Sequence, residues 1–271
     1  MDPNLQNGEF KKVSYKKRGK PSNSVIKGLN QLLEIIDESF NLDLNIRRIK
    51  EAKEELHSAD LYQSVTALLK EGIGHLNNPK ISKIISLGLG RIHDSTIARY
   101  QFALLLCLRD LTDADIVASD PVFNKHDISI LEYFDVVVDK NNQEGKYCVK
   151  EEVVLFYLPH CPKQLTNNLL WSNWGLHLSN CIIICNSINK IVEDNTKKDL
   201  TRCAYFLNQI CPYVCELGVV NSFRLFEVFN DTSIHVFPID KLKLLGVDFW
   251  NVFAEPVYSD NDIEFVKGAN K

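Results

Sequence analysis

The segment IISLGLGRIHDSTIARYQFALLLCL, from Ile84 to Leu108, decides the fold class, because it joins an apolar strand to an apolar helix through a turn with two glycines. Glycine adopts the positive φ angles that tight turns need, and it lets another group approach the backbone closely. The first question that the sequence raises is which group approaches the backbone at Gly88 and Gly90.

Short apolar runs alternate with amphipathic segments from residue 81 onward. Strands are predicted at 83–89, 115–120, 135–139, 153–159, 181–186, 213–218 and 233–238. Helices are predicted between most of them, at 95–109, 124–132, 163–174 and 199–209. Several strands are apolar at successive residues, as strands covered by helices on both faces must be. The pattern predicts a three-layer, Rossmann-like α/β fold with a mainly parallel sheet.

Three regions are expected along the chain. Residues 1–24 are polar and aperiodic, which predicts a disordered basic tail. Residues 25–78 are expected to form an N-terminal helical section, with helices over 24–40, 44–56 and 60–76. Residues 79–271 then form the Rossmann-like domain.

The composition is that of an ordinary globular protein, with 45% hydrophobic and 24% charged residues among 271. No apolar run approaches the roughly 20 residues that span a bilayer, and the N-terminus lacks the apolar stretch of a secretory signal. We therefore expect a protein of the cytoplasm and nucleus that makes no membrane contact.

The net charge of −4 is unevenly distributed. Residues 11–20, KKVSYKKRGK, hold six basic residues and no acidic one, which suits either a nuclear-import patch or a solvated tail. Without these six, 25 basic residues stand against 35 acidic residues. The rest of the chain is therefore acidic, and an acidic surface binds nucleic-acid phosphates poorly. We therefore expect protein partners rather than direct nucleic-acid binding.

The eight cysteines include two pairs with three intervening residues, Cys181 with Cys185 and Cys211 with Cys215. Neither pair has the spacing of a zinc knuckle, and no histidine lies at finger spacing. We expect reduced cysteines that pack as small apolar residues, and no metal.

Polar or conformationally special residues follow four of the predicted strands. Ligands of open parallel sheets bind beyond the carboxyl ends of the strands. The candidate ligand-binding residues at these ends are Gly88, Gly90, Asp120, His160 and Asn186. We expect them to gather at one pocket.

The glycine turn narrows the choice of ligand. A dinucleotide fingerprint needs a third glycine where this chain has His93, so the full motif is absent. A G-x-G turn also opens the sites of many methyltransferases, so S-adenosylmethionine or a nucleotide is the leading candidate. Asp120, 30 residues beyond Gly90, would bind the ribose hydroxyls. The alternative is a plain strand-to-helix turn, with Ser95 as the helix cap and Asp120 closing its own loop.

The segment PHCPKQLTNNLLWSNW begins with two prolines that flank His160 and Cys161. Adjacent side chains on an extended chain point in opposite directions, so His160 is badly placed to activate Cys161 as a nucleophile. We expect a shape-defining turn with His160 facing the pocket. Further along, Asn168, Asn173 and Trp174 are candidates for polar tethering of loops.

Several blocks of the sequence resemble the signature blocks of the sensitivity-to-red-light-reduced family: IISLGLGRIHDSTIARYQFALLLCL, ASDPVF, LFYLPHCP, NLLWSNW and DTSIHVF. They occur in order between about residues 81 and 240, so the resemblance is specific. It implies a regulator of circadian clock input in plants and animals, with links among relatives to heme biosynthesis and microtubule stability. It brings no catalytic residues, so these stay unknown, and the candidate positions rest on strand-end reasoning.

The sequence supports two functional hypotheses of different classes. The first is a clock-input regulator that acts through protein partners in the cytoplasm and nucleus. The second is an S-adenosylmethionine- or nucleotide-binding enzyme, such as a small-molecule methyltransferase. The fold alone does not decide between them, because such sheets carry many functions.

Overall fold

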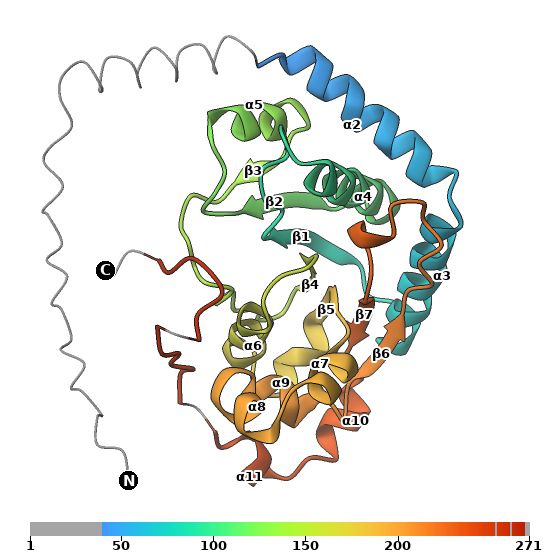
Figure 1. Ribbon diagram of the computed structural model, residues 1–271. Helices are drawn as coiled ribbons and strands as arrows, with labels where there is room; N and C mark the ends of the chain where they lie inside the picture. The colour runs from blue at the N-terminus through green and yellow to red at the C-terminus, as the bar shows by residue number, and fades with distance from the viewer. Residues whose placement is uncertain (1–39, 253, 261, 269–271) are drawn as a thin grey trace, which may run out of the picture. The chain divides into compact units, whose positions relative to one another are not determined.

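A seven-stranded sheet in the order β3-β2-β1-β4-β5-β7-β6 forms the centre of the domain (Figure 1). The computed structural model describes residues 40–252, 254–260 and 262–268, and its elements belong to the unit Leu42–Lys271. The strands are β1 (Ile81–Leu87), β2 (Asp115–Ser119), β3 (Val137–Val138), β4 (Val153–Leu158), β5 (Cys181–Asn186), β6 (Cys215–Gly218) and β7 (Thr232–Val236). The predicted α/β fold is therefore confirmed.

The sheet is mainly parallel, as predicted. Strands β1 to β5 pair in parallel, whereas β7 runs antiparallel to both β5 and β6. The order is the doubly wound order 3-2-1-4-5-6 with one strand, β7, inserted before the last. The point at which the chain changes direction across the sheet lies between β1 and β4.

Helices follow most of the strands. They are α4 (Thr96–Thr112), α5 (Lys125–Tyr133), α6 (Lys163–Ser172), α7 (Ile188–Asp194), α8 (Lys197–Cys203), α9 (Tyr205–Ile210), α10 (Ile239–Lys243) and α11 (Val247–Trp250), with short 3₁₀ turns at η1 (Leu176–Asn180) and η2 (Phe226–Val228). The helix predicted at 199–209 is divided in two at Ala204, whose φ and ψ angles of −151° and 41° are not helical.

Neighbouring residues of β4 show why its sequence is apolar throughout. Phe156 points into a cluster that includes Leu169 of α6 and Leu207 of α9. Tyr157 points to the other face, where its hydroxyl donates to the Gln101 carbonyl of α4 at 3.0 Å. Both aromatic side chains are fully buried. Helices therefore cover both faces of the sheet, as the apolar pattern predicted.

Two further helices, α2 (Leu42–His57) and α3 (Asp60–His75), lie close to the predicted ranges 44–56 and 60–76. They share the core of the domain, because Leu56 and Leu69 are fully buried. Lys53 of α2 forms an ion pair with Asp110 of α4.

The predicted tail at 1–24 and the predicted helix before α2 lie outside the described residues. None of the helices in the described ranges is long and apolar enough to cross a membrane.

Helix α4 begins with the predicted cap. The Ser95 hydroxyl accepts a hydrogen bond from the Ala98 amide at 3.2 Å. Ser95→Ala is expected to destabilise the fold by about 1 kcal/mol, because it removes this cap. The melting temperature should fall by about 2–4 °C in a thermal unfolding experiment. Ser129→Ala, which changes a partly exposed serine inside α5, should leave it unchanged. Equal effects of the two substitutions would contradict the assignment of the cap.

Candidate functional site

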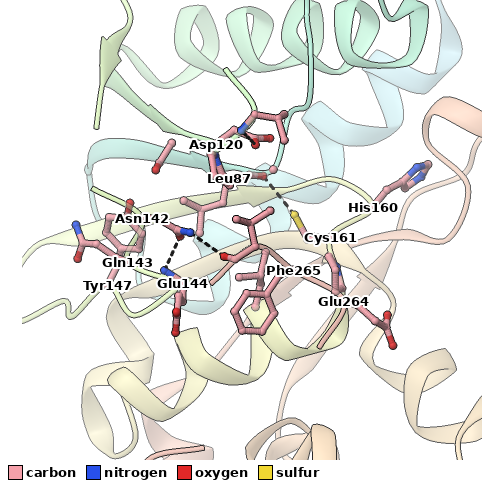
Figure 2. A pocket seen from close by; sticks show the side chains of 18 residues that line it. Leu87, Asp120, Asn142, Gln143, Glu144, Tyr147, His160, Cys161, Glu264 and Phe265 are labelled. Carbon is pink, nitrogen blue, oxygen red and sulfur yellow. Dashed lines mark hydrogen bonds between the residues drawn. The ribbon is translucent and has the colours of Figure 1, made fainter. Parts of the chain in front are cut away.

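A pocket of about 200 Å³ lies beyond the carboxyl ends of β1, β2 and β4 (Figure 2). We call it the edge pocket. The residues that line it are Leu87, Gly88, Ser119, Asp120, Pro121, Val122, Asn142, Gln143, Glu144, Gly145, Tyr147, His160, Cys161, Pro162, Leu165, Glu264, Phe265 and Val266. Because both β1 and β4 contribute, the edge pocket lies where open α/β sheets bind their ligands.

The group that approaches Gly88 most closely is the thiol of Cys161. Gly88 has a φ of +68°, and a Cβ atom at this position would overlap the Cys161 sulfur. The thiol donates to the Leu87 carbonyl at 3.3 Å, and its side chain is buried. Burial, followed by the charge of Asp120, raises the pKa of the thiol far above its usual value. Cys161 therefore packs as a neutral thiol and is no nucleophile at neutral pH.

Asp120 joins the turn after β1 to the turn after β2. One carboxylate oxygen accepts from the Gly90 amide at 2.7 Å, and the other accepts from the Val122 amide at 2.9 Å. The Gly88 amide donates to the Ser119 carbonyl at 3.3 Å. The amide groups of both glycines are thus already engaged by the protein.

His160 lies on the ridge between two pockets. Its backbone has a φ of +53°, and its Nε2 lies 3.3 Å from the Asn230 carbonyl. It lines both the edge pocket and a polar pocket over β5, which also includes Asn186, Ser187 and Lys190 and which we call the side pocket. Its ring points away from Cys161 in Figure 2, although the backbone at His160 is a left-handed turn and not an extended strand.

The structure brings together three of the five candidate residues in the edge pocket: Gly88, Asp120 and His160. Gly90 does not line this pocket, and its amide donates a hydrogen bond to the Asp120 carboxylate. Asn186 lies in the side pocket, and its amide donates to the Cys161 carbonyl at 3.3 Å.

Sequence reasoning missed two walls of the edge pocket, the loop 142–147 and the segment Glu264–Val266. The Asn142 side chain ties them together: its amide donates to the Val266 carbonyl at 2.7 Å, and its oxygen accepts from the Glu144 amide at 3.1 Å (Figure 2). The Gly268 amide also donates to the Glu144 carboxylate at 2.7 Å. Neither wall has apolar periodicity, so the sequence carried no signal for them.

Two of the three predicted loop tethers on α6 and beyond it are confirmed. Asn168 donates to the Glu144 carbonyl at 2.8 Å. Asn173 accepts from the Val149 amide at 2.7 Å and donates to the Tyr147 carbonyl at 2.8 Å. The prediction for Trp174 is wrong: within the described residues its buried indole nitrogen has no hydrogen-bond partner. Its ring instead packs among Phe206, Phe249 and Trp250.

Residues 49–236 match the SRR1 domain family. The chain belongs to this family. The matched region starts inside α2, so it reaches further toward the N-terminus than the blocks between about residues 81 and 240 that resemble the family. The family assignment therefore covers the edge pocket apart from its C-terminal wall.

Several relatives carry the family name. An SRR1-like protein of Drosophila melanogaster is 28% identical over 74% of this chain and 72% of its own length. An SRR1-like protein of Mus musculus is 32% identical over 55% of this chain and 73% of its own. The protein SENSITIVITY TO RED LIGHT REDUCED 1 of Arabidopsis thaliana is 24% identical over 57% of this chain and 58% of its own.

Solved structures show a looser likeness. A mutant of MtNAS is 15% identical, with a TM-score of 0.40 over 73% of this chain and 70% of that chain. The complex of the MtNAS mutant with S-adenosylmethionine is 14% identical, with a TM-score of 0.38 over 72% of this chain and 74% of that chain.

Carboxylates dominate the charge of the edge pocket in this SRR1 domain. Asp120, Glu144 and Glu264 line it, and none of the described residues in its lining is a lysine or an arginine. Burial raises the pKa of Glu144, but the Gly268 amide and Lys146 outweigh burial, so the pKa lies below its usual value. Burial also raises the pKa of Tyr147 to about 12, so its hydroxyl stays protonated. The edge pocket is thus acidic at neutral pH.

A second cluster of ionisable side chains lies inside the SRR1 domain, away from the edge pocket. His235 of β7 is fully buried, and its Nε2 lies 3.4 Å from the Glu216 carboxylate of β6. The Cys185 sulfur of β5 lies 3.6 Å from the Nδ1 of the same ring, which also lies 3.1 Å from the Ile183 carbonyl. Glu216 in turn accepts from the Asn189 amide of α7 at 2.9 Å. The cluster links three strands to the first turn of α7.

The described residues hold no group of three or more His, Cys, Asp or Glu side chains that could bind a metal ion. All eight cysteines are free thiols. Five of them, including both members of the pair Cys181 and Cys185, are buried.

Proposed function

We propose that this protein is a regulator in a circadian clock input pathway, and that it binds a small nucleoside-containing ligand in the edge pocket. Membership of the SRR1 domain family supports a regulator of the SRR1 type. The name of the Arabidopsis relative, which refers to sensitivity to red light, supports a role on the light-input side of the clock.

The observation that carries the ligand proposal is the position of the edge pocket. Gly88 follows β1, and His160 and Cys161 follow β4, so the pocket spans the point where the strand order reverses. Sheets of this kind bind nucleosides and their derivatives at that point. Asp120, at the end of β2, is placed where an acid contacts a ribose in such sheets. S-adenosylmethionine and nucleotides are both candidates on this basis.

The cellular part of the proposal includes the regulation of heme biosynthesis, a link to microtubule stability, and residence in the cytoplasm and nucleus with unidentified protein partners. These roles are what the resemblance to the sensitivity-to-red-light-reduced family implies. Cells without the protein should show an altered light response of a rhythmic reporter and a changed heme content. A tagged full-length chain should appear in both compartments. An unchanged rhythm and heme content would contradict the regulatory proposal.

A second candidate function is an S-adenosylmethionine-dependent small-molecule methyltransferase. The Gly88–Gly90 turn before α4 and the acid after β2 favour it. The test is the formation of S-adenosylhomocysteine from S-adenosylmethionine in the presence of a metabolite extract. Binding of S-adenosylmethionine without this product would favour the regulator. Turnover that is lost when a larger side chain narrows the edge pocket would favour the enzyme.

A thermal shift screen tests whether the edge pocket binds a ligand. The panel consists of S-adenosylmethionine, S-adenosylhomocysteine, NAD, ATP and GTP. A ligand at 100 times its dissociation constant stabilises the native state by about 2.7 kcal/mol. Because each kcal/mol raises the melting temperature of a domain of this size by about 2–4 °C, at least one member should produce a clear shift.

Two variants locate the binding site. Val122 is 40% exposed and lines the edge pocket, so Val122→Trp should fill the pocket and abolish the shift. Val220 is 69% exposed and does not line the edge pocket, so Val220→Trp is the matched control and should keep the shift. A panel without any shift, or a shift that survives Val122→Trp, would contradict binding in this pocket.

A further inference from the structure

We propose that the edge pocket selects a nucleoside-type ligand that carries no phosphate group and is neutral or cationic. This inference rests on the proposed function. The position of the pocket suits both S-adenosylmethionine and nucleotides, and the inference favours S-adenosylmethionine or another nucleoside without phosphate. It follows from two independent features of the pocket, the hydrogen bonds of the glycine turn and the charges of the walls.

The first feature is that the glycine turn has no free amide to offer at either glycine. Phosphate sites in such sheets use backbone N–H groups of a glycine-rich turn, helped by the following helix N-terminus. Here the Gly90 amide donates to the Asp120 carboxylate, and the Gly88 amide donates to the Ser119 carbonyl. The Ala98 amide in the first turn of α4 donates to Ser95. A phosphate at this turn would have to displace the carboxylate of Asp120 and would lie beside it.

The second feature is the sign of the charge around the pocket. Three carboxylates line it, those of Asp120, Glu144 and Glu264. Glu144 and Glu264 are each paired with a lysine, so Asp120 carries most of the charge that opposes a polyphosphate and favours a cation such as a sulfonium.

Two lysines near these walls, Lys163 and Lys146, have carboxylate partners. Lys163 pairs with Glu264 at 3.4 Å, and Lys146 pairs with Glu144 at 3.0 Å. In the side pocket, Lys190 pairs with Asp231 at 2.6 Å. A phosphate would therefore have to compete with an existing ion pair for each of these cations.

The remaining lining suits the apolar faces of a nucleobase. Leu87, Val122, Leu165 and Phe265 contribute apolar side chains, and Phe265 lies at the pocket in Figure 2. Small-molecule sites are mostly apolar with a few placed polar groups, and aromatic faces stack on bases. The pocket thus offers an apolar surface to the base and a carboxylate, Asp120, to the hydroxyls or to a positive charge.

Lys140 allows a test of the opposite case, in which the protein binds a phosphate. Lys140 lines a smaller pocket that shares Asp120 with the edge pocket. Asp139 also lines this smaller pocket. If the protein bound a nucleotide after all, Lys140 is the side chain that a phosphate would reach from there.

The direct test is calorimetric titration of the full-length chain with adenosine, S-adenosylmethionine, AMP, ATP and NAD at one ionic strength. We expect adenosine or S-adenosylmethionine to bind, and ATP and NAD to bind at least about tenfold more weakly, the ratio that one partly screened charge pair produces. ATP binding as tightly as adenosine would overturn the inference and leave the proposed ligand site standing. Failure of every compound to bind would count against the proposed function itself.

Three variants show whether charge sets the selectivity. Val122→Lys adds a cation to the edge pocket and should strengthen ATP binding about tenfold while weakening S-adenosylmethionine binding. Val220→Lys is the matched control and should change neither affinity. Lys140→Met should also change neither. Loss of ATP binding in Lys140→Met would place phosphates beside Asp120 and overturn the inference.

Discussion

Replacing Gly88 with alanine is expected to destabilise the protein by about 3 kcal/mol, because two costs add at this residue. A φ of +68° costs a residue with a Cβ atom roughly 1–2 kcal/mol. The new methyl group would also overlap the Cys161 sulfur, and overpacking of this kind costs about 1–3 kcal/mol. Thermal unfolding should show a fall of about 2–4 °C for each kcal/mol.

A double-mutant cycle separates the two costs. Cys161→Ala removes the sulfur, so Gly88→Ala should cost at least about 1 kcal/mol less in that background than in the parent. Gly90→Ala is the control, since its φ is +74° but the nearest atom to its new methyl group is the Ala98 Cβ at 4.0 Å. It should show the backbone cost alone. Full additivity of Gly88→Ala and Cys161→Ala would contradict the contact between Gly88 and the thiol.

Replacing Glu216 with leucine is expected to destabilise the protein by about 3–5 kcal/mol, because it leaves the buried His235 without its carboxylate partner. Burial raises the pKa of Glu216, but the hydrogen bond and charge of His235 outweigh it and lower the pKa to about 2. Burial lowers the pKa of His235, but the neighbouring Cys185 and Glu216 outweigh it and raise the pKa to about 10. Chemical denaturation measures the loss, and Glu193→Leu on the exposed side of α7 is the control.

The pair also predicts how stability depends on pH. The pKa of Glu216 is lower in the folded protein, so its contribution is present above the ordinary value of 4.5 and is lost as the pH falls toward 2. The pKa of His235 is raised on folding, so its contribution is full below 6.5 and is lost as the pH rises toward 10. Both losses of stability come from the same pair, Glu216 and His235. Glu216→Gln should therefore make the stability less dependent on pH in both ranges. An unchanged pH profile in Glu216→Gln would contradict the charged pair.

The sequence allowed a close prediction of the strands, because each is marked by its own apolar residues. Strand β5 was predicted at its observed bounds, Cys181–Asn186, since all but its last residue are buried. Strand β3 is shorter than the predicted 135–139 because it pairs with β2 only at Val137 and Val138. The antiparallel direction of β7 carries no signature in its residues, since it depends on how the chain returns to β5.

The candidate site was predictable only where it follows the strand ends. Gly88, Asp120 and His160 were found because parallel strands bring their carboxyl ends to one edge. The contact between Gly88 and the Cys161 thiol could not be found in this way, since strand-end reasoning brings the two turns to one edge but does not say which side chain packs against the glycine. The contact of Asn142 with the Val266 carbonyl joins segments far apart in the chain by a side chain and a backbone atom, which leaves no pattern in either segment.

The most direct test of a phosphate-free nucleoside site is a crystal structure of the full-length protein grown with adenosine and, separately, with ATP, both at the same concentration, a few times the dissociation constant of adenosine. We expect adenosine in the edge pocket, with its base against Phe265 and its ribose beside Asp120, and no bound triphosphate in the ATP crystals. Adenosine bound elsewhere, or ATP seated with its phosphates at the Gly88–Gly90 turn, would contradict this expectation.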